Sequence, residues 1–262
     1  MEARFILRGI QQIIRLRIKN FFTHPIENKF LFVLSPPFCG STLITEALSK
    51  HGLVSCNNRN GTREGQRLPF VNKLMFLRND RWNPDAKFDW EKIKWWWFSY
   101  WDRSKLILLE KSPPNIIRAL DLERYFEPAY FILFIRNPYA HCQSLMTRNG
   151  QTAKEAAEFT IECMNYQKFN LLNLKNVLLI SYEDFTQNKT YTLNRIKEFI
   201  PELDNLLLNV EFNAHNFKGV PLTLSNLNQE KISKLSQQDL NTINKVFSNH
   251  KPLLNSFGYS LM

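Results

Sequence analysis

Cysteine, glycine and long apolar runs are all scarce in this chain of 262 residues. The four cysteines form no CxxC pair and have no histidine at the spacing of zinc ligands; they are Cys39, Cys56, Cys142 and Cys163. Neither a zinc site nor a disulfide framework is therefore expected, and a reducing, cytoplasmic location is favoured. Because only eight glycines occur, each one that lies in a turn is expected to have a conformational role there.

The N-terminal segment, residues 1–28, lacks the uninterrupted apolar run of a transmembrane helix or a signal peptide. Basic residues interrupt the apolar residues of positions 1–20; they are Arg4, Arg8, Arg15, Arg17 and Lys19. This pattern predicts a basic amphipathic helix. Two placements of the helix are open. Packing of one face on the rest of the protein is favoured, and peripheral contact of residues 1–20 with an anionic membrane is the alternative.

The chain also lacks RGG tracts, zinc-finger spacings and RNP-like aromatic motifs, so no nucleic-acid partner is expected. Its formal net charge is +10 and its pI is near 9.5. A basic balance of this size favours an anionic small ligand, an acidic polymer or a membrane surface, but it does not choose among them.

Apolar runs that predict buried strands alternate with segments that predict helices. Four strands are expected, at residues 29–34, 105–110, 129–135 and 176–181. Helices are expected at residues 41–51, 69–76, 90–101, 113–125, 137–147, 152–174, 189–200 and 229–248, with a polar loop at 54–65. This alternation predicts a single α/β domain over residues 29–262, in which helices cover both faces of a central parallel sheet.

A polar or charged group follows each of the four expected strands. Residues 35–42 follow the first strand, Lys111 the second, Arg136 the third and Tyr182 the fourth. Ligands of parallel α/β sheets bind beyond the carboxyl ends of the strands. The four strand ends are therefore expected to form one site, and their chemistry suits an anionic nucleotide.

The first strand end reads PPFCGST, residues 36–42, and leads directly into a predicted helix. Backbone N–H groups and hydroxyls at a helix N-terminus suit an anion, and the helix dipole assists them. A nucleoside-triphosphate loop needs GxxxxGK[ST], and this chain has no lysine there. The segment therefore predicts a P-loop-like three-layer sandwich without triphosphate machinery, and taken alone it also fits an ordinary helix cap.

Four segments together resemble the sulfotransferase superfamily, whose members use 3′-phosphoadenosine-5′-phosphosulfate (PAPS). Residues 37–43 resemble the family's Pro-Arg/Lys-Ser-Gly-Thr-Thr/Ser-Leu loop, and EKSPPN, residues 110–115, resembles the Glu-Lys-Ser/Thr-Pro element of carbohydrate-type members. Arg136 and Ser144 match an arginine and a serine spaced by eight, and ISYEDF, residues 180–185, resembles a segment after a late strand. The match covers residues 32–185 and includes tyrosine-type features.

The resemblance implies how PAPS is held. Arg136 and Ser144 would bind its 3′-phosphate, and Tyr182 would flank the adenosine. Lys218 and Gly219, in FKGV, resemble a basic-glycine loop that also touches the 3′-phosphate. The loop that would hold the 5′-phosphosulfate consists of Phe38, Cys39, Gly40, Ser41, Thr42 and Leu43. The resemblance implies no metal.

The resemblance also implies catalytic residues. Lys111 would lie near the transferring sulfuryl group. Glu64 stands on the polar loop where carbohydrate-type and tyrosine-type members place a catalytic glutamate, and it is the favoured general base. His51, at the end of the first helix after the loop, is the second candidate, although a histidine there is more often a cap.

Two further features concern the acceptor. Arg63, with its neighbours Arg59 and Arg67, is either a solvated loop charge or a group that binds an anionic acceptor. On the helix predicted at residues 90–101, one tryptophan face predicts a core stripe, and Trp96 lies off that face as a candidate for the acceptor pocket.

Phe38 departs from the family pattern, because members carry lysine or arginine at this position. The task of neutralising the leaving phosphate then passes to Lys111 or to a nearby arginine, or turnover is weak.

The sequence thus predicts in-line transfer of the sulfuryl group of PAPS to a hydroxyl of a small metabolite, natural product or saccharide, with release of 3′,5′-adenosine bisphosphate. Two alternatives stay open. A P-loop-like nucleotide kinase is disfavoured by the missing GK[ST]. A non-catalytic nucleotide-binding protein at a membrane periphery is favoured by Phe38 and the basic N-terminus. Neither the acceptor nor the oligomeric state is specified.

Overall fold

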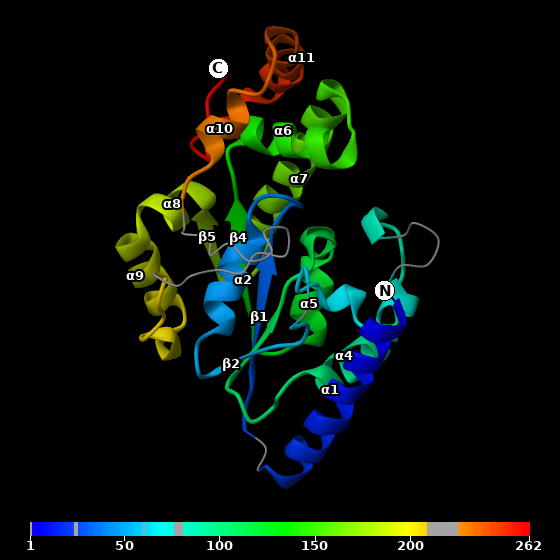
Figure 1. Ribbon diagram of the computed structural model, residues 1–262. Coiled ribbons are helices and arrows are strands. Elements are labelled where there is room, and N and C mark those ends of the chain that lie inside the picture. Colours follow the sequence, from blue (N-terminus) through cyan, green and yellow to red (C-terminus); the bar gives the residue numbers. More distant parts are fainter. Residues whose placement is uncertain (1, 24–25, 60, 76–80, 209–224) are drawn as a thin grey trace.

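The computed structural model describes residues 2–23, 26–59, 61–75, 81–208 and 225–262. Five parallel strands form a sheet in the order β2-β3-β1-β4-β5 (Figure 1). Because β1 is central and lies between β3 and β4, the residues that follow these three strands meet at one edge. The strands are β1 Lys29–Leu34, β2 Val54–Cys56, β3 Ile107–Glu110, β4 Ala129–Ile135 and β5 Val177–Ser181.

Helices surround the sheet on both faces and beyond its carboxyl edge. The α-helices are α1 Glu2–Phe22, α2 Ser41–Ser49, α3 Asn72–Met75, α4 Trp90–Tyr100, α5 Ala119–Tyr125, α6 Pro138–Asn149, α7 Ala153–Asn173, α8 Tyr182–Gln187, α9 Lys189–Phe199, α10 Asn228–Ile232, α11 Gln237–Phe247 and α12 Lys251–Ser256. Short 3₁₀ helices are η1 Gly65–Arg67, η3 Pro113–Ile117, η4 Pro201–Leu203 and η5 Ser248–His250.

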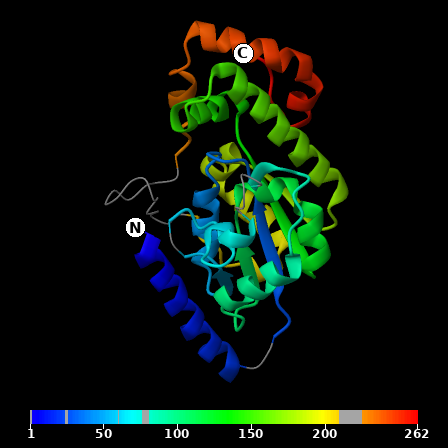
Figure 2. The same cartoon turned by 90° about the vertical axis from the view of Figure 1, so that its right-hand side faces the viewer.

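Successive residues of β1 point to opposite faces of the sheet and divide the interior into two cores. Phe30 and Phe32 belong to the core formed with α4, α5 and α7. Leu31 and Val33 belong to the core formed with α2, α8 and α9. A third apolar cluster joins α6, α7, α11 and α12 beyond the carboxyl ends of the strands (Figures 1 and 2). The helices of this third cluster therefore lie next to the strand ends at which the sequence places the site.

The turn from β4 into α6 shows how local sequence positions a site residue. Asn137 Oδ1 accepts hydrogen bonds from the backbone N–H groups of Tyr139 and Ala140, so Asn137 caps α6. Pro138 occupies the first turn, where its missing N–H costs nothing. The chain therefore turns from strand to helix immediately after Arg136, and this fixes Arg136 at the edge of the sheet.

The observed elements differ from the sequence expectations in several places, among them the helices α8 and α12, which were not expected. Residues 54–65 are not wholly loop, because Val54–Cys56 forms a fifth strand, β2, against β3. The helix expected at residues 113–125 is divided into η3 and α5 at Arg118, whose φ and ψ are −131° and 18°. The helix expected at residues 229–248 is likewise two helices, α10 and α11. Ser236 caps α11 through a capping box with Asp239, and this local cap ends the continuity.

The N-terminal helix packs one face on the domain, as the favoured placement predicts. Ile13 and Leu16 are buried, and Gln12 Nε2 donates to the backbone oxygens of Asn57 and Tyr100. Figure 2 shows α1 along the outside of the domain. Over the residues that the structure describes, no helix combines the length and apolar character needed to cross a membrane.

Candidate active site

The loop between β1 and α2 has a backbone shaped to face an anion. Phe38 and Gly40 both have left-handed conformations, with φ of 61° and 89°. Gly40 immediately precedes α2. The N–H groups of Ser41 and Thr42 have no acceptor four residues earlier within the helix, while the N–H of Leu43 donates to the backbone oxygen of Gly40 at 2.9 Å. The positive end of the helix dipole adds to the attraction of the first two N–H groups for an anion. Cys39 is buried, and burial raises the pKa of its thiol, so it stays protonated.

Gly40 is required at its position for two independent reasons. Its φ of 89° disfavours a side chain, and an added Cβ would lie 2.9 Å from Cδ2 of Tyr182. Gly258 has a similar φ of 78°, with no atom within 4 Å of an added Cβ. Tyr182 therefore packs directly under the loop, and the glycine allows this approach.

We expect Gly40→Ala to lower the free energy of unfolding by about 3 kcal/mol, since strain in the backbone and overlap with Tyr182 both contribute. Gly258→Ala, which adds only the backbone strain, should cost about 1 kcal/mol. Urea denaturation of the two variants measures the difference. Equal losses would show that contact with Tyr182 does not restrict the loop.

Arg136 is the central cation of the site. Its side chain is buried, with Nε donating to Oδ1 of Asn228 at 2.7 Å and Nη1 donating to the backbone oxygen of Phe38 at 3.3 Å. Its guanidinium carbon lies 4.2 Å from the ring centroid of Tyr182. The buried Nη2 has no hydrogen-bond partner among the described residues. A buried cationic donor in this state is suited to bind an anion.

Further cations gather around Arg136. Burial lowers the pKa of Lys231 on α10, and the positive charges of Arg148 and Arg136 lower it further. Arg148, at the end of α6, also lies with its guanidinium carbon 5.6 Å from the ring centroid of Phe38. Mutual repulsion among cations is relieved when an anion binds between them. Sequence reasoning missed Arg148 and Lys231, because neither lies in a recognisable motif.

Glu183 connects the C-terminal helices to the strand ends. Its carboxylate accepts from the backbone N–H of Asn137 at 2.9 Å, from Nδ2 of Asn228, and from the hydroxyl of Tyr259 at 3.0 Å. Since Asn228 in turn accepts from Arg136, the chain from residue 225 onward orients the arginine. Sequence reasoning missed Glu183, Asn228 and Tyr259 as well, because their partners are distant in the chain.

Ser144 and Tyr182 lie at the expected strand and helix positions. Ser144 is buried on α6, and its Oγ donates to the backbone oxygen of Ala140 at 2.9 Å. The hydroxyl of Tyr182 donates to the backbone oxygen of Ser225 at 2.9 Å. Tyr182 thus fastens the start of the C-terminal segment to the loop, while Ser144 must turn its hydroxyl to donate to a ligand.

A second group of charges surrounds Lys111, at the end of β3. Lys111 is buried, and its Nζ donates to the backbone oxygen of Thr62 at 2.6 Å. Burial lowers the pKa of Lys111, while the carboxylates of Glu64 and Glu110 oppose that effect. Lys111 therefore lies close to the polar segment that follows β2, as its neighbouring strand position requires.

Glu64 is buried among cations. Its Oε2 accepts from Nε of Arg67 at 3.0 Å and from Nη2 of Arg81. Burial raises the pKa of Glu64, but Lys111, Arg81 and Arg67 outweigh burial and hold the pKa below its ordinary value. Glu64 is therefore ionised at neutral pH and can accept a proton or a hydrogen bond.

Glu110, at the end of β3, holds the backbone beside Glu64 and Lys111. It is fully buried and accepts from the backbone N–H of Gly65 at 3.0 Å, from Oγ of Ser112 at 2.6 Å, and from Nδ2 of Asn115. A Cβ on Gly65 would lie 2.7 Å from Oε1 of Glu110, so glycine is needed for this contact. Glu110 thereby fixes the backbone next to Glu64.

Burial raises the pKa of Glu110 from 4.5 to about 7, despite the opposing hydrogen bonds from Ser112 and Gly65. Between these pH values the folded protein retains a proton that the unfolded chain has released, so stability should fall as pH rises. The raised pKa of Glu110 contributes about 3 kcal/mol to the free energy of unfolding at low pH, and this contribution is lost at high pH. Urea denaturation measures the free energy of unfolding below pH 4.5 and above pH 7. The difference between the two should be smaller in Glu110→Gln than in the unmodified protein by about this amount. An unchanged difference would contradict the assignment.

The structure does not bring every predicted residue to the site. His51 follows the C-terminal end of α2 and precedes β2, so it lies toward the amino edge of the sheet, away from the loop at the other end of the helix. Nη2 of Arg63 pairs with Oε2 of Glu46 at 2.5 Å instead of standing free for an acceptor.

Trp96 stacks on Phe70 with ring centroids 4.4 Å apart. The stripe predicted for the other face of α4 is confirmed as core, with Trp90, Trp97 and Trp101 buried. Lys218 and Gly219 lie outside the described residues. Within the described part of the chain, no cluster of histidine, cysteine or carboxylate side chains could hold a metal ion.

Comparisons with known proteins bear on the family and the fold of the chain. The model of the sulfotransferase family matches residues 31–202, which include the loop, Lys111, Arg136 and Tyr182. No curated protein matches the chain.

Several solved structures share the fold, among them three sulfotransferase structures. The sulfotransferase domain of the Synechococcus PCC 7002 olefin synthase has a TM-score of 0.56 at 21% identity, over 92% of this chain and 98% of that one. A sulfotransferase from Alicyclobacillus acidocaldarius has a TM-score of 0.53 at 12% identity, over 88% and 96%. A sulfotransferase from Mycobacterium avium has a TM-score of 0.52 at 14% identity, over 98% and 82%.

Proposed function

Because the chain belongs to the sulfotransferase family, we propose that it transfers the sulfuryl group of PAPS to a hydroxyl of a small metabolite, natural product or saccharide. The observation that carries the choice of donor is the buried Nη2 of Arg136, a cationic donor without a partner among the described residues. Arg136 lies beside the loop that leads into α2, in which Phe38 and Gly40 have left-handed conformations. These features fit a nucleotide with separate anionic groups at its two ends.

The two ends of the nucleotide are assigned from charge and position. The loop, residues 38–43, and the start of α2 hold the 5′-phosphosulfate through backbone N–H groups. Arg136 and Ser144 hold the 3′-phosphate. Arg148 and Lys231 add positive charge beside Arg136, and Lys111 supplies at the 5′ end the charge that Phe38 does not. The ring of Tyr182 flanks the adenosine.

The chain's own residues perform the transfer by positioning and electrostatics. PAPS supplies the sulfuryl group and the leaving phosphate. Lys111, a buried cation at the end of β3, stabilises the negative charge that develops on the transferring group. Glu64 accepts the proton of the acceptor hydroxyl as it attacks in line. Glu110 and Gly65 keep Glu64 in place. No metal takes part in this scheme.

The burial of Glu64 favours a small acceptor, and the state of the cysteines favours a cytoplasmic enzyme. Glu64 is buried, and this favours an acceptor that is small or that enters end-on. All four cysteines are free, as is usual in a reducing compartment.

Calorimetric titration of the protein with 3′,5′-adenosine bisphosphate, in parallel with ATP plus magnesium, tests the proposal. Selective binding of the bisphosphate is expected, followed by transfer of labelled sulfuryl from PAPS to members of an acceptor panel. A preference for ATP with magnesium would favour a nucleotide kinase instead. Tight binding of the bisphosphate without transfer to any acceptor would favour a non-catalytic nucleotide-binding protein.

A further inference from the structure

Helix α1 has a second apolar face that the domain does not cover. Its residues are spaced by three or four, so they form one stripe along the helix. Their side chains are between 36% and 83% exposed; they are Leu7, Ile10, Ile14, Ile18 and Phe21. Phe22, next to the end of the stripe, is 79% exposed. We call these six residues the α1 stripe.

Basic residues border the α1 stripe. On a helix of 3.6 residues per turn, Arg8, Arg15 and Lys19 fall on the arc next to it, on the side away from Arg17. The carboxylate of Asp102 pairs with Nζ of Lys19 at 2.6 Å. Apolar and basic arcs side by side are the pattern of helices that lie in the interface of an anionic membrane.

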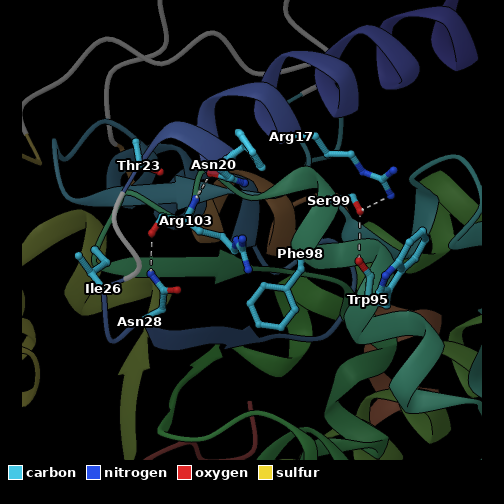
Figure 3. Close-up of a pocket in the computed structure, with 10 residues that line it drawn as sticks. Arg17, Asn20, Thr23, Ile26, Asn28, Trp95, Phe98, Ser99 and Arg103 are labelled. Atoms are coloured by element: carbon cyan, nitrogen blue, oxygen red, sulfur yellow. Dashed lines mark hydrogen bonds between the residues drawn. The ribbon is translucent and has the colours of Figure 1, made fainter.

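A groove of about 750 Å³ continues the α1 stripe between the C-terminal half of α1 and α4 (Figure 3). Arg17 and Arg103 bring two cations to it, each beside an aromatic ring. The guanidinium carbon of Arg17 lies 4.9 Å from the ring centroid of Trp95, and that of Arg103 lies 5.8 Å from the ring centroid of Phe98. Phe21 lines the same groove.

The groove and the candidate active site lie at opposite edges of the sheet. Asn28, which lines the groove, directly precedes β1, and Arg103 precedes β3. The nucleotide loop, Lys111 and Arg136 follow the carboxyl ends of the strands. In Figure 1 the end of α1 and the helices α10 and α11 accordingly lie at opposite ends of the molecule.

We propose that the α1 stripe and this groove dock the protein on an anionic phospholipid bilayer. The α1 stripe enters the boundary between head groups and acyl chains, and Arg17 and Arg103 meet lipid phosphates. Trp95, 54% exposed, suits that boundary because tryptophan is favoured at membrane interfaces. Docking at the amino ends of the strands leaves the candidate active site, at their carboxyl ends, open to substrates.

Charge favours a bilayer over a second copy of the chain. Two copies joined through their α1 stripes would bring together the basic arcs of two molecules that each carry a net charge of +10. Like charges of this density repel across an interface. An anionic lipid surface instead attracts the basic arc.

Cosedimentation of the full chain with vesicles tests the proposal. The protein is expected to bind vesicles of equimolar phosphatidylcholine and phosphatidylglycerol and not vesicles of phosphatidylcholine alone. The triple variant Ile14→Ser/Ile18→Ser/Phe21→Ser should bind about tenfold more weakly or worse. Arg17→Ser/Arg103→Ser should also weaken binding. Raising the salt from about 0.1 M to about 1 M should reduce binding of the unmodified protein, because the charges become screened.

A matched control removes exposed apolar side chains elsewhere. Phe169→Ser/Leu172→Ser/Leu207→Ser changes three residues that are 47%, 70% and 71% exposed and should bind vesicles as the unmodified protein does. Circular dichroism and thermal unfolding confirm folding of each variant. Binding of 3′,5′-adenosine bisphosphate should be the same in all of them, so the outcome is independent of the proposed catalytic function.

Three results would overturn the proposal: no binding to anionic vesicles, unchanged binding of the α1 stripe variant, or equal loss in the control. A dimer in solution that the α1 stripe variant converts to monomers, without vesicle binding, would assign the surface to a second copy of the chain.

Discussion

Glu64→Gln is expected to retain binding of 3′,5′-adenosine bisphosphate while its turnover falls by about 10²–10⁴-fold. The amide keeps the size of the side chain and one acceptor oxygen, but it takes up no proton. Because Lys111, Arg81 and Arg67 hold the pKa of Glu64 below its ordinary value, the carboxylate is already ionised at neutral pH. The loss should therefore be nearly constant across neutral pH and should not be recovered by making the solution more alkaline.

The structure supplies a matched control for this variant. Glu46, on α2, is likewise a glutamate paired with an arginine, Arg63. Glu46→Gln should leave turnover within a few-fold of the unmodified protein. Steady-state transfer from PAPS to the fastest acceptor of the panel, with calorimetry of bisphosphate binding, measures both variants. Normal turnover in Glu64→Gln would remove Glu64 as the base, and a parallel loss of nucleotide binding would assign it a structural role.

Local signals in the sequence predicted the elements that carry the site. The apolar runs of β1 and β4 are buried along most of their length, and each ends where a turn-forming sequence begins. Asn137 caps α6, and Thr152 forms a capping box with Glu155 at the start of α7. Such caps act within four residues, so they are legible in one sequence without knowledge of the fold.

Contacts between distant segments were not predictable in the same way. β2 is three residues long and exists because Ile107–Leu109 pairs with it, more than fifty residues later in the chain. Asn228, which orients Arg136, begins α10, and Tyr259, which contacts Glu183, lies after the end of α12; neither carries a motif. Arg63 was a candidate for the acceptor until its pairing with Glu46 appeared. In each case a tertiary partner decides the role of a residue whose local sequence is neutral.

Arg136→Ala should weaken binding of 3′,5′-adenosine bisphosphate by about 100-fold, because it removes a buried cation that is proposed to hold the 3′-phosphate. The loss should depend on that phosphate. Adenosine 5′-monophosphate, which lacks it, should bind the unmodified protein more weakly than the bisphosphate does. In Arg136→Ala the two nucleotides should bind almost equally. Arg136→Lys should be intermediate, since it keeps the charge but loses the planar fork of donors.

The control for this prediction is Arg124→Ala. Arg124 also lies near an aromatic ring, with its guanidinium carbon 5.7 Å from the ring centroid of Tyr125, but it stands at the end of α5, before β4. Its replacement should leave both affinities unchanged. Thermal unfolding separates the proposed role from a structural one, because Arg136 also bonds Asn228 and Phe38. If a folded Arg136→Ala lost affinity for the two nucleotides equally, Arg136 would be shaping the loop around the 5′-phosphate, and the 3′-phosphate would have to be placed among Arg148 and Lys231.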